Sequence, residues 1–246
     1  MEIGIIGSGF AAKRIFKIIK NFNNSIKINF YSKTPRTFFI ERKKIKLRNL
    51  NLKNINFEED LFFIANNTAE HFKYISLLLK KNKAIYVEKP LCTSKKELEE
   101  IKILSKKCKK KIEVGFQFRE NKCVKFLKRE ISKNRKNIIS VLCYSGENVK
   151  NYHKNENYLS SYTINKKKGG GVVLTQSHQI DYLNFLFGNL KILKAIKSNK
   201  NSLLNLKTNV ETNVLYLCKT NDEIPISCNL NFFGLRETFI LIYFKN

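Results

Sequence analysis

Apolar and polar residues follow two alternating patterns in the first half of the chain. Short runs of consecutive apolar residues, typical of strands buried on both faces of a sheet, are separated by segments in which apolar residues recur at helical spacing. The runs predict strands over residues 3–6, 26–31, 60–65, 84–87 and 112–116. The helical segments cover residues 13–20, 66–81 and 94–110, and the last begins with a capping box formed by Ser94 and Glu97. This alternation predicts an α/β fold with a doubly wound parallel sheet of Rossmann type.

The pattern changes after Arg119. Residues 121–133 have helical spacing, residues 138–145 alternate like a strand, and residues 147–168 form a polar, tyrosine-rich loop. Another helix ends at Gly188, and strand-like runs follow at residues 191–197, 212–219, 224–231 and 238–244. We therefore expect a Rossmann domain over residues 1–118 and an α+β domain over residues 119–246, with a mostly antiparallel, open-faced sheet.

A glycine turn directly follows the first predicted strand. Its sequence, Gly7-Ser8-Gly9-Phe10-Ala11-Ala12, matches G-x-G-x-x-A and leads into the first helix. In this context Gly7 permits the tight turn, Gly9 lets a pyrophosphate approach the backbone, and Ala12 allows close packing of helix and strand. The helix N-terminus offers N–H groups to the phosphates. The segment predicts a dinucleotide site at Gly7, Ser8, Gly9, Phe10 and Ala11, and an ordinary glycine turn is the alternative.

The end of the second predicted strand bears on the type of dinucleotide. NAD-binding folds place an acidic residue about twenty positions beyond the glycine motif, where it binds the ribose 2′-hydroxyl. This chain has Ser32, Lys33 and Arg36 there instead. A hydroxyl and two cations suit a 2′-phosphate, so we predict NADP in preference to NAD, which remains an alternative cofactor.

Lys89 follows the buried strand at residues 84–87, within the sequence Glu88-Lys89-Pro90-Leu91. Ligands of open parallel sheets bind beyond the carboxyl ends of the strands. A lysine at such an end is placed to meet both a nicotinamide ring and a bound hydroxyl. One more solvated lysine in a lysine-rich chain is the alternative interpretation.

Four motifs together resemble a known family. They are the glycine turn at residues 7–12, the Glu-Lys-Pro-Leu segment, residues 114–119 (Val-Gly-Phe-Gln-Phe-Arg), and the glycine run at residues 169–171 with His178-Gln179-Ile180-Asp181. In this order and at these distances they resemble the glucose–fructose oxidoreductase/inositol dehydrogenase (Gfo/Idh/MocA) family. The resemblance implies an NAD(P)-dependent oxidoreductase that transfers a hydride between the cofactor and a sugar, amino sugar or nucleotide sugar.

The resemblance also implies roles for individual residues. Lys89 would bind the reacting oxygen and stabilise its developing negative charge, and His178 would act as general acid/base, with a capping or packing histidine as the alternative. Further cofactor contacts are expected from Asn66, Thr68, His71, Glu88, Lys89 and Gln117. Substrate contacts are expected from Lys89, Arg119, Tyr158, Tyr162, Thr175 and His178. The tyrosine-rich loop is similar to one in a family branch found near surface-polysaccharide genes, which suggests a substrate of surface-glycan biosynthesis.

Two departures from the family pattern lead to a second hypothesis. Many relatives carry an aspartate three residues before the histidine, where this chain has Thr175. Relatives also continue for several dozen residues beyond the position of Asn246, so we expect a shortened C-terminal domain. The second hypothesis is a catalytically impaired dinucleotide-binding relative with a regulatory role or no enzymatic role.

Charge and composition restrict the partners. The chain has 47 basic and 20 acidic residues, for a net charge of +27. Such an excess favours polyanions, but the basic residues are spread along the whole chain, so we predict no nucleic-acid partner. No apolar run approaches the length that spans a bilayer, so no membrane association is predicted.

Cysteine and histidine usage indicates the compartment. The six cysteines form no C-x-x-C pair and there are three histidines, so we predict no metal site. Scattered thiols of this kind are typical of a reducing compartment, and we expect a cytoplasmic protein. The open sheet of the second domain predicts a homo-oligomer, a dimer or a tetramer.

Overall fold

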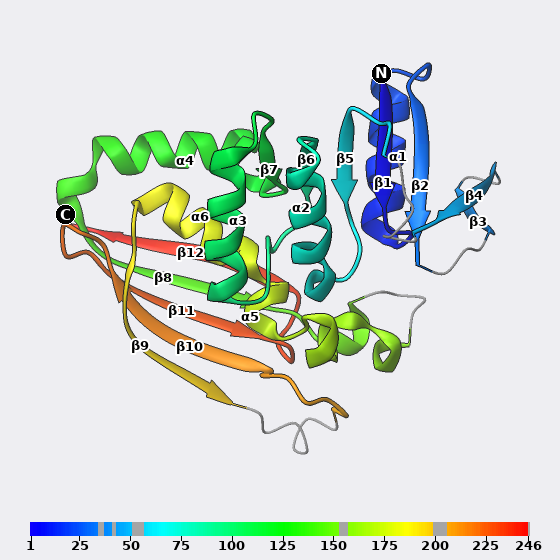
Figure 1. Cartoon of the computed structure of the whole chain (residues 1–246). Helices are drawn as coiled ribbons and strands as arrows, with labels where there is room; N and C mark the ends of the chain where they lie inside the picture. The colour runs from blue at the N-terminus through cyan, green and yellow to red at the C-terminus, as the bar shows by residue number, and fades with distance from the viewer. Residues whose placement is uncertain (34–36, 41–42, 51–56, 153–156, 199–205, 246) are drawn as a thin grey trace. The chain divides into compact units, whose positions relative to one another are not determined.

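The computed structural model describes residues 1–33, 37–40, 43–50, 57–152, 157–198 and 206–245. The chain forms two compact units, Met1–Gly115 and Phe116–Asn246 (Figure 1). The sequence placed the domain boundary three residues later, after residue 118.

The first unit is built on a sheet of seven strands in the order β3-β4-β2-β1-β5-β6-β7. All neighbours pair in parallel except β3, which pairs antiparallel with β4 at the edge. The strands are β1 (Glu2–Ile6), β2 (Lys27–Ser32), β3 (Thr37–Ile40), β4 (Lys43–Asn49), β5 (Leu61–Ile64), β6 (Ala84–Val87) and β7 (Ile112–Val114). This is the predicted Rossmann-type parallel sheet. The sequence did not predict β3 and β4, because the lysines and arginine of β4 interrupt its apolar positions.

The first unit contains α-helices whose starts follow recognisable sequence signals, such as a glycine turn and a capping box. They are α1 (Phe10–Phe22), α2 (His71–Lys80) and α3 (Lys95–Lys107), with a 3₁₀ turn η1 (Thr68–Glu70) before α2. The predicted capping box is present: the Ser94 hydroxyl accepts a hydrogen bond from the Glu97 backbone N–H. Strand β1 pairs with β2 on one side and β5 on the other, so the strand order reverses at β1. Ligands of such folds bind at this reversal, directly after β1.

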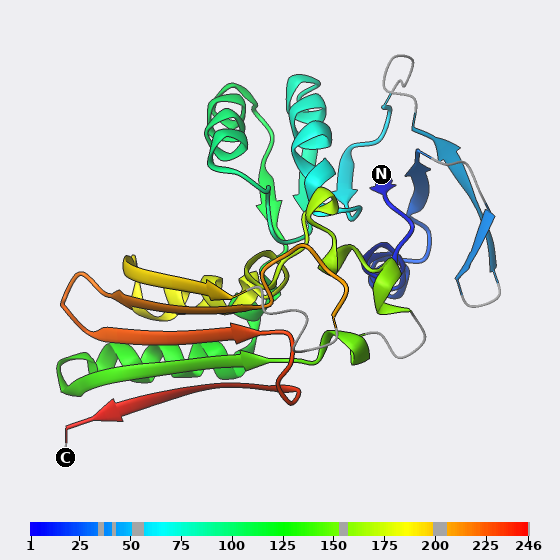
Figure 2. The same cartoon turned by 90° about the horizontal axis from the view of Figure 1, so that it is seen from below.

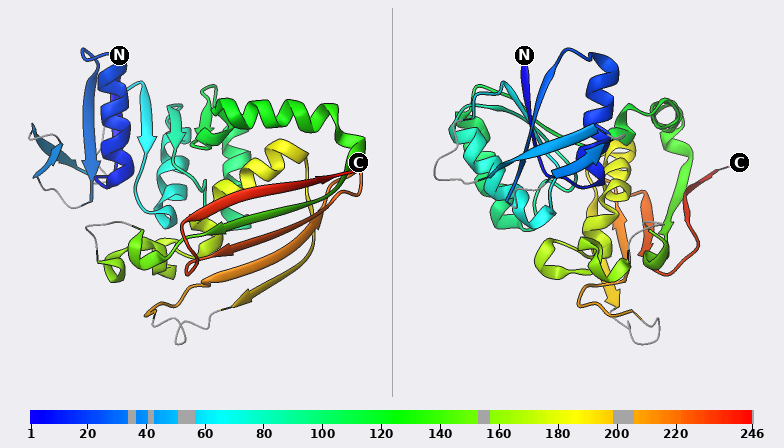
Figure 3. Two further views of the ribbon diagram at one scale, coloured as in Figure 1. Left: turned by 180° about the vertical axis from the view of Figure 1, so that it is seen from behind. Right: turned by 90° about the vertical axis from the view of Figure 1, so that its right-hand side faces the viewer.

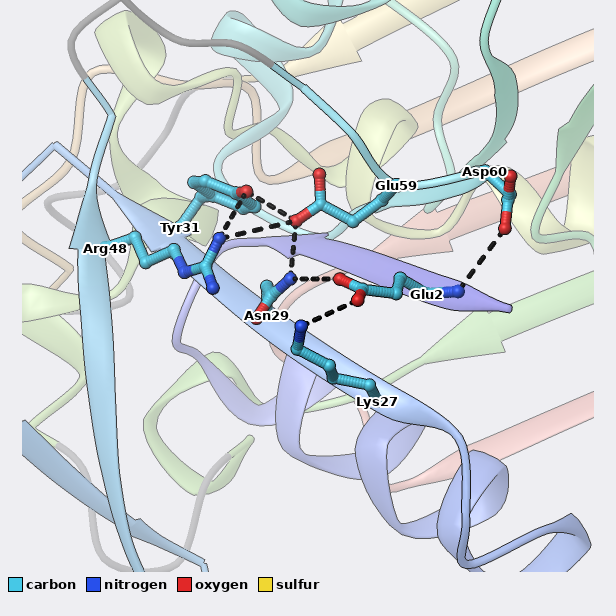
Figure 4. A network of polar contacts seen from close by, with 7 residues as sticks. All are labelled: Glu2, Lys27, Asn29, Tyr31, Arg48, Glu59 and Asp60. Carbon is cyan, nitrogen blue, oxygen red and sulfur yellow. Dashed lines mark hydrogen bonds and ion pairs between the residues drawn. The ribbon is translucent and has the colours of Figure 1, made fainter.

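A polar network joins β1, β2 and β4 to the segment that precedes β5 (Figure 4). Glu59 is 1% exposed, and one carboxylate oxygen accepts hydrogen bonds from the Tyr31 hydroxyl (2.5 Å) and the Asn29 amide (2.8 Å). The Arg48 guanidinium lies 4.0 Å from the same oxygen. Burial and the neighbouring carboxylate raise the pKa of Tyr31 well above its usual range. The network therefore holds Tyr31 in place near the carboxyl end of β2.

The second unit is built on a sheet of five strands in the order β12-β8-β11-β10-β9 (Figure 2). The strands are β8 (Ile138–Gly146), β9 (Lys191–Ser198), β10 (Asn213–Lys219), β11 (Pro225–Asn231) and β12 (Glu237–Phe244). The sheet is mostly antiparallel, as predicted, but β8 and β11 pair in parallel. The sequence could not indicate this pair, because a strand with one buried face alternates in the same way in either direction.

Helices cover one face of this second sheet (Figure 3). They are α4 (Lys122–Lys133), α5 (Val172–Thr175) and α6 (Ser177–Phe187), with short 3₁₀ turns η2 (Gln117–Glu120) and η3 (Arg135–Asn137) flanking α4. Side chains such as Ile131 and Leu183 pack with Val141 and Cys228 in one apolar core. The described residues of the predicted tyrosine-rich loop form four further 3₁₀ turns, η4 (Val149–Asn151), η5 (Tyr158–Ser160), η6 (Tyr162–Ile164) and η7 (Lys166–Lys168). No helix in the described parts of the chain is both long and apolar enough to cross a membrane.

Candidate functional site

A cavity of about 420 Å³ lies at the carboxyl ends of β1, β2 and β5 in the first unit. Six of the predicted cofactor residues line it: Gly7, Ser8, Gly9, Ser32, Lys33 and Asn66. Six residues that the sequence analysis did not single out also line it: Ile6, Tyr31, Leu50, Asn67, Glu70 and Tyr74. The cavity occupies the position at which Rossmann folds bind ligands, because it surrounds the point where the strand order reverses.

The glycine turn shapes one wall of this cavity. Gly7 has φ +126°, and a Cβ there would lie 2.5 Å from the Ala65 carbonyl oxygen, so only glycine fits. A Cβ on Gly9 would meet no atom of the described chain within 4 Å. Helix α1 begins at the next residue, and its N-cap residue is Gly9, which has no side chain to cap the helix. The turn therefore leaves open space before a helix N-terminus, which is what a pyrophosphate requires.

Two of the residues that line the same cavity carry buried polar atoms. The Asn66 side-chain oxygen and the Tyr74 hydroxyl have no hydrogen-bond partner among the described residues. Burial raises the pKa of Tyr74 to about 12, so its hydroxyl keeps its proton at physiological pH. Buried polar groups are stabilised by a hydrogen-bond partner, and a polar ligand in the cavity would supply one. The chemistry of this wall fits a dinucleotide.

The charged residues at the end of β2 differ from the simple arrangement that the sequence suggested. The Lys33 ammonium forms an ion pair with the Glu70 carboxylate, and the Asn66 amide lies 3.3 Å from the other Glu70 oxygen. Ser32 is half-buried and ends β2. Arg36 lies outside the described residues. The sequence analysis missed Glu70, although its place directly before the His71 helix, in the segment after a buried strand, was a usable signal.

Lys89 follows β6, and its neighbour Glu88 is held firmly. The Glu88 backbone N–H donates to the Ile64 carbonyl (2.9 Å), and the Glu88 carboxylate binds the Arg14 guanidinium of α1 (2.8 Å). Burial lowers the pKa of Lys89 to about 8; Glu88 opposes this shift and Arg14 adds to it. An amine with this pKa exchanges its proton close to neutral pH, which suits a group that binds a reacting oxygen.

His71 is almost fully buried, at 1% exposure, beside the cavity rather than in its lining. Its Nδ1 lies 2.9 Å from the Pro90 carbonyl oxygen and its Nε2 lies 3.1 Å from the Asn66 carbonyl oxygen. Burial lowers the pKa of this histidine. His71 thus joins the segments that follow β5 and β6. Thr68 is buried in η1, and Phe10 and Ala11 form the first turn of α1; cofactor contacts from these residues stay predictions.

In the second unit, His178 lies near the start of α6 and is half-buried. Its ring is 4.5 Å from the Phe118 ring and 6.1 Å from the Phe116 ring, centroid to centroid. One turn later Asp181 binds the Arg119 guanidinium through both oxygens, with Nε to Oδ2 at 2.9 Å. The sequence analysis interpreted Arg119 as a substrate contact and assigned no catalytic role to Asp181. The structure shows that each side chain binds the other, which connects η2 to α6.

The glycine run has a packing role. A Cβ on Gly170 would lie 2.4 Å from the carbonyl oxygens of both Tyr162 and Thr163, and the Gly171 N–H donates to the Thr163 carbonyl (2.8 Å). The run therefore allows the η6 backbone to approach closely and fixes the position of Tyr162. Tyr158, on η5, is half-buried, and Thr175, at the end of α5, is 3% exposed.

The structure assembles the predicted residues in two groups. The first unit brings the glycine turn, Ser32, Lys33 and Asn66 together around the cavity. The second unit holds His178, Arg119 and the tyrosine-bearing turns, and Gln117 begins its η2 as an exposed residue. Lys89 and His178 belong to different units, so their action on one substrate stays a prediction.

The first unit also matches a known protein family in sequence. Residues 1–116 match the Gfo/Idh/MocA model, which describes an oxidoreductase family with an NAD-binding Rossmann fold. Residues 1–116 belong to the NAD-binding domain of the Gfo/Idh/MocA family. No curated protein matches the sequence.

Solved structures of this family share the fold of nearly the whole chain. The WlbA dehydrogenase of Bordetella pertussis, solved with NADH and UDP-GlcNAcA, has a TM-score of 0.80 at 15% identity, over 99% of this chain and 75% of that one. The scyllo-inositol dehydrogenase of Lactobacillus casei, solved with NAD(H) and scyllo-inositol, has a TM-score of 0.76 at 18% identity, over 98% and 72%. At such identities the likeness establishes the fold.

Proposed function

We propose that this Gfo/Idh/MocA chain is an NAD(P)-dependent oxidoreductase that acts on a hydroxyl or carbonyl group of a sugar, amino sugar or nucleotide sugar. The observation that carries the proposal is the cavity at the strand reversal, with a glycine turn on one side and the unpartnered Asn66 and Tyr74 atoms on another. The sugar class is supported by the ligands of the WlbA and scyllo-inositol dehydrogenase structures. The nucleotide sugar bound to WlbA is consistent with a role in surface-glycan biosynthesis.

The chain's own residues would divide the chemistry as follows. Gly7, Gly9 and the α1 N-terminus hold the pyrophosphate of the dinucleotide, which supplies the hydride donor or acceptor. Lys89 hydrogen-bonds the reacting oxygen and stabilises its developing negative charge. His178 accepts the hydroxyl proton on oxidation and returns it on reduction.

The preference for NADP stays a prediction. Ser32 and Lys33 line the cavity, which supports it, but Lys33 is bound to Glu70. Isothermal titration with both dinucleotides measures this preference directly, and tighter binding of NAD would contradict it.

A second candidate function is a dinucleotide-binding relative without turnover. The observation that favours it is Thr175, a neutral and nearly fully buried residue at the position where many relatives carry an aspartate. Lacking that carboxylate, His178 would have less support for its charged form.

One experiment separates the two candidates. Both dinucleotides are titrated into the protein, and turnover is then followed by nicotinamide absorbance with a panel of inositols, hexoses, amino sugars and UDP-sugars. Turnover that is lost in Lys89→Gln, while dinucleotide binding is kept, supports the enzyme. Tight binding with no turnover on any substrate supports the second candidate, and absence of dinucleotide binding contradicts both.

We also propose a homo-oligomer that forms through the uncovered face of the second sheet. Paired strands align apolar side chains across this face in two rows, Ile196-Leu215-Asn229-Tyr144-Phe239 and Lys194-Leu217-Ser227-Leu142-Leu241. Leu215, Leu217 and Leu241 are 41%, 47% and 45% exposed. Both rows are apolar except at Asn229 and Ser227 on β11 and Lys194 on β9, and exposed apolar side chains gathered on one sheet face are typical of a protein interface. All six cysteines are free thiols, which supports the proposed cytoplasmic location.

A further inference from the structure

We propose that Glu70 shifts cofactor specificity toward NAD, by supplying from the start of α2 the carboxylate that the end of β2 lacks. In this proposal Glu70 accepts hydrogen bonds from the adenosine ribose, and it disfavours a 2′-phosphate. The inference rests on the proposed dinucleotide binding and extends it to a residue outside the usual specificity position.

The position of Glu70 is the first argument. Glu70 ends η1, directly before α2, and lines the same cavity as Ser32 and Lys33, the residues at the end of β2. Rossmann folds discriminate NAD from NADP at that strand end, where a carboxylate binds the 2′-hydroxyl and a cation binds the 2′-phosphate. Here the strand end provides a hydroxyl and a cation, and the carboxylate comes from a residue 37 positions later in the chain.

The contacts of Glu70 are the second argument. One carboxylate oxygen binds the Lys33 ammonium and the other faces the Asn66 amide at 3.3 Å. The two oxygens of an ionised carboxylate have about four acceptor positions, so capacity remains for ribose hydroxyls. The side chains of Glu70 and Lys33 are 29% and 49% exposed, so a ligand can reach both.

The electrostatic consequence follows from this pair. Lys33 by itself would attract the two extra negative charges of a 2′-phosphate, but its charge is balanced by Glu70. A phosphate near Lys33 is also near the Glu70 carboxylate, and two like charges a few ångströms apart in a partly solvated cavity repel each other. Glu70 therefore shifts the relative affinity from NADP toward NAD, whichever cofactor the wild-type protein prefers.

The test compares NADH and NADPH binding in wild type, Glu70→Gln, Lys33→Gln and a matched control, Glu99→Gln. Glu99 lies on α3, is half-exposed, and pairs with Lys102 outside the cavity, so its replacement removes the same charge elsewhere. Dissociation constants are measured by isothermal titration at low and high salt, and a melting curve for each variant confirms folding.

We expect Glu70→Gln to raise the affinity for NADPH relative to NADH on the order of tenfold, with a smaller shift at high salt. Glu99→Gln should leave this ratio within about twofold of wild type, because distant exposed charges are screened. Lys33→Gln should move the ratio in the opposite direction, and it tests the pair independently if Glu70→Gln does not fold.

The experiment distinguishes failure of the Glu70 inference from failure of the proposed function. An unchanged ratio in Glu70→Gln and Lys33→Gln, with both dinucleotides bound, would overturn this inference and leave the proposed function standing. If the wild-type protein binds neither dinucleotide, the proposed function falls and the inference falls with it.

Discussion

The Arg14 guanidinium lies 2.8 Å from a carboxylate oxygen of Glu88, although 74 positions separate the two residues in the chain. Arg14 is in the first turns of α1, directly after the glycine turn, and Glu88 directly precedes Lys89. Glu88 is 8% exposed, and Arg14 provides this buried carboxylate with an ion-pair partner. The ion pair therefore connects the helix that begins at the glycine turn to the strand end that carries Lys89, and it sets part of the electrostatic environment of the lysine.

The first prediction concerns the protonation of Lys89. Because burial favours the neutral amine, Lys89 should titrate with a pKa of about 8. Its ammonium form is lost as the pH rises through that value, so turnover that depends on the ammonium should decline there. Reductive ¹³C-methylation followed by NMR titration measures this pKa, and the signal is assigned by its absence in Lys89→Gln. A Lys89 that titrates with the bulk of the lysines would contradict the prediction.

The same pKa has a consequence for stability. The folded protein binds this proton less readily than the unfolded chain between about pH 8 and the ordinary value of 10.5. Lys89 therefore destabilises the folded protein most below about pH 8, and this destabilisation should decrease as the pH rises across the window.

The second prediction concerns the Arg14–Glu88 pair. Arg14→Met removes a positive charge near Lys89 and should raise its pKa, whereas Glu88→Gln removes a negative charge and should lower it. The same NMR titration measures both shifts. Lys73→Met removes an exposed charge from α2 and serves as the control, with no expected change. Shifts in the same direction for both variants would refute this account.

The third prediction separates the two glycines of the turn. Gly7→Ala forces a side chain into positive φ and against the Ala65 carbonyl, so the free energy of unfolding should fall by about 1–3 kcal/mol. Gly9 has φ −79° and open space around its Cβ position, so Gly9→Ala should change stability by less than about 0.5 kcal/mol. The added methyl should nevertheless weaken dinucleotide binding about tenfold or more, since it occupies the pyrophosphate's approach. Urea unfolding and isothermal titration measure the two effects; equal binding by Gly9→Ala would argue against this site.

The fourth prediction concerns the network behind the cavity. Tyr31→Phe keeps the ring but removes a hydrogen bond to the buried Glu59 carboxylate, so stability should fall by about 1–3 kcal/mol. Dinucleotide affinity should stay close to that of wild type, because the apolar part of the cavity wall is retained. Tyr243→Phe, at an exposed position of β12, is the control and should change neither quantity. Unaltered urea unfolding of Tyr31→Phe would show that the network contributes little.

The fifth prediction tests the oligomer. Leu217→Lys replaces an exposed apolar side chain on the uncovered face of the second sheet with a charge and should weaken self-association, as measured by sedimentation velocity over a concentration series. Ile103→Lys makes the same kind of change at an exposed position of α3 in the first unit and should leave association unchanged. A wild-type protein that stays monomeric at every concentration would contradict the proposed interface.

The sequence predicted the strands and turns that depend on residues close to one another in the chain. The apolar runs predicted five strands of the first sheet, Ser94 and Glu97 predicted the start of α3, and Gly7 predicted a turn that only glycine can make. Each of these depends on neighbouring residues, so the order of the side chains contains the information. Strand β4 was not predicted because its mixture of lysines and apolar residues is also found in exposed loops, and β3 is a strand of only four residues beside it.

By itself, then, the sequence determined the Rossmann-type domain, its family and the position of the glycine turn. Only the tertiary structure decided which charges meet: Arg14 with Glu88, Lys33 with Glu70, and Arg119 with Asp181. These partners are 74, 37 and 62 positions apart, and in a chain with 47 basic residues no pattern marks which cation will face which acid. An ion pair depends on a distance in space of a few ångströms, and packing of the helices and strands sets that distance.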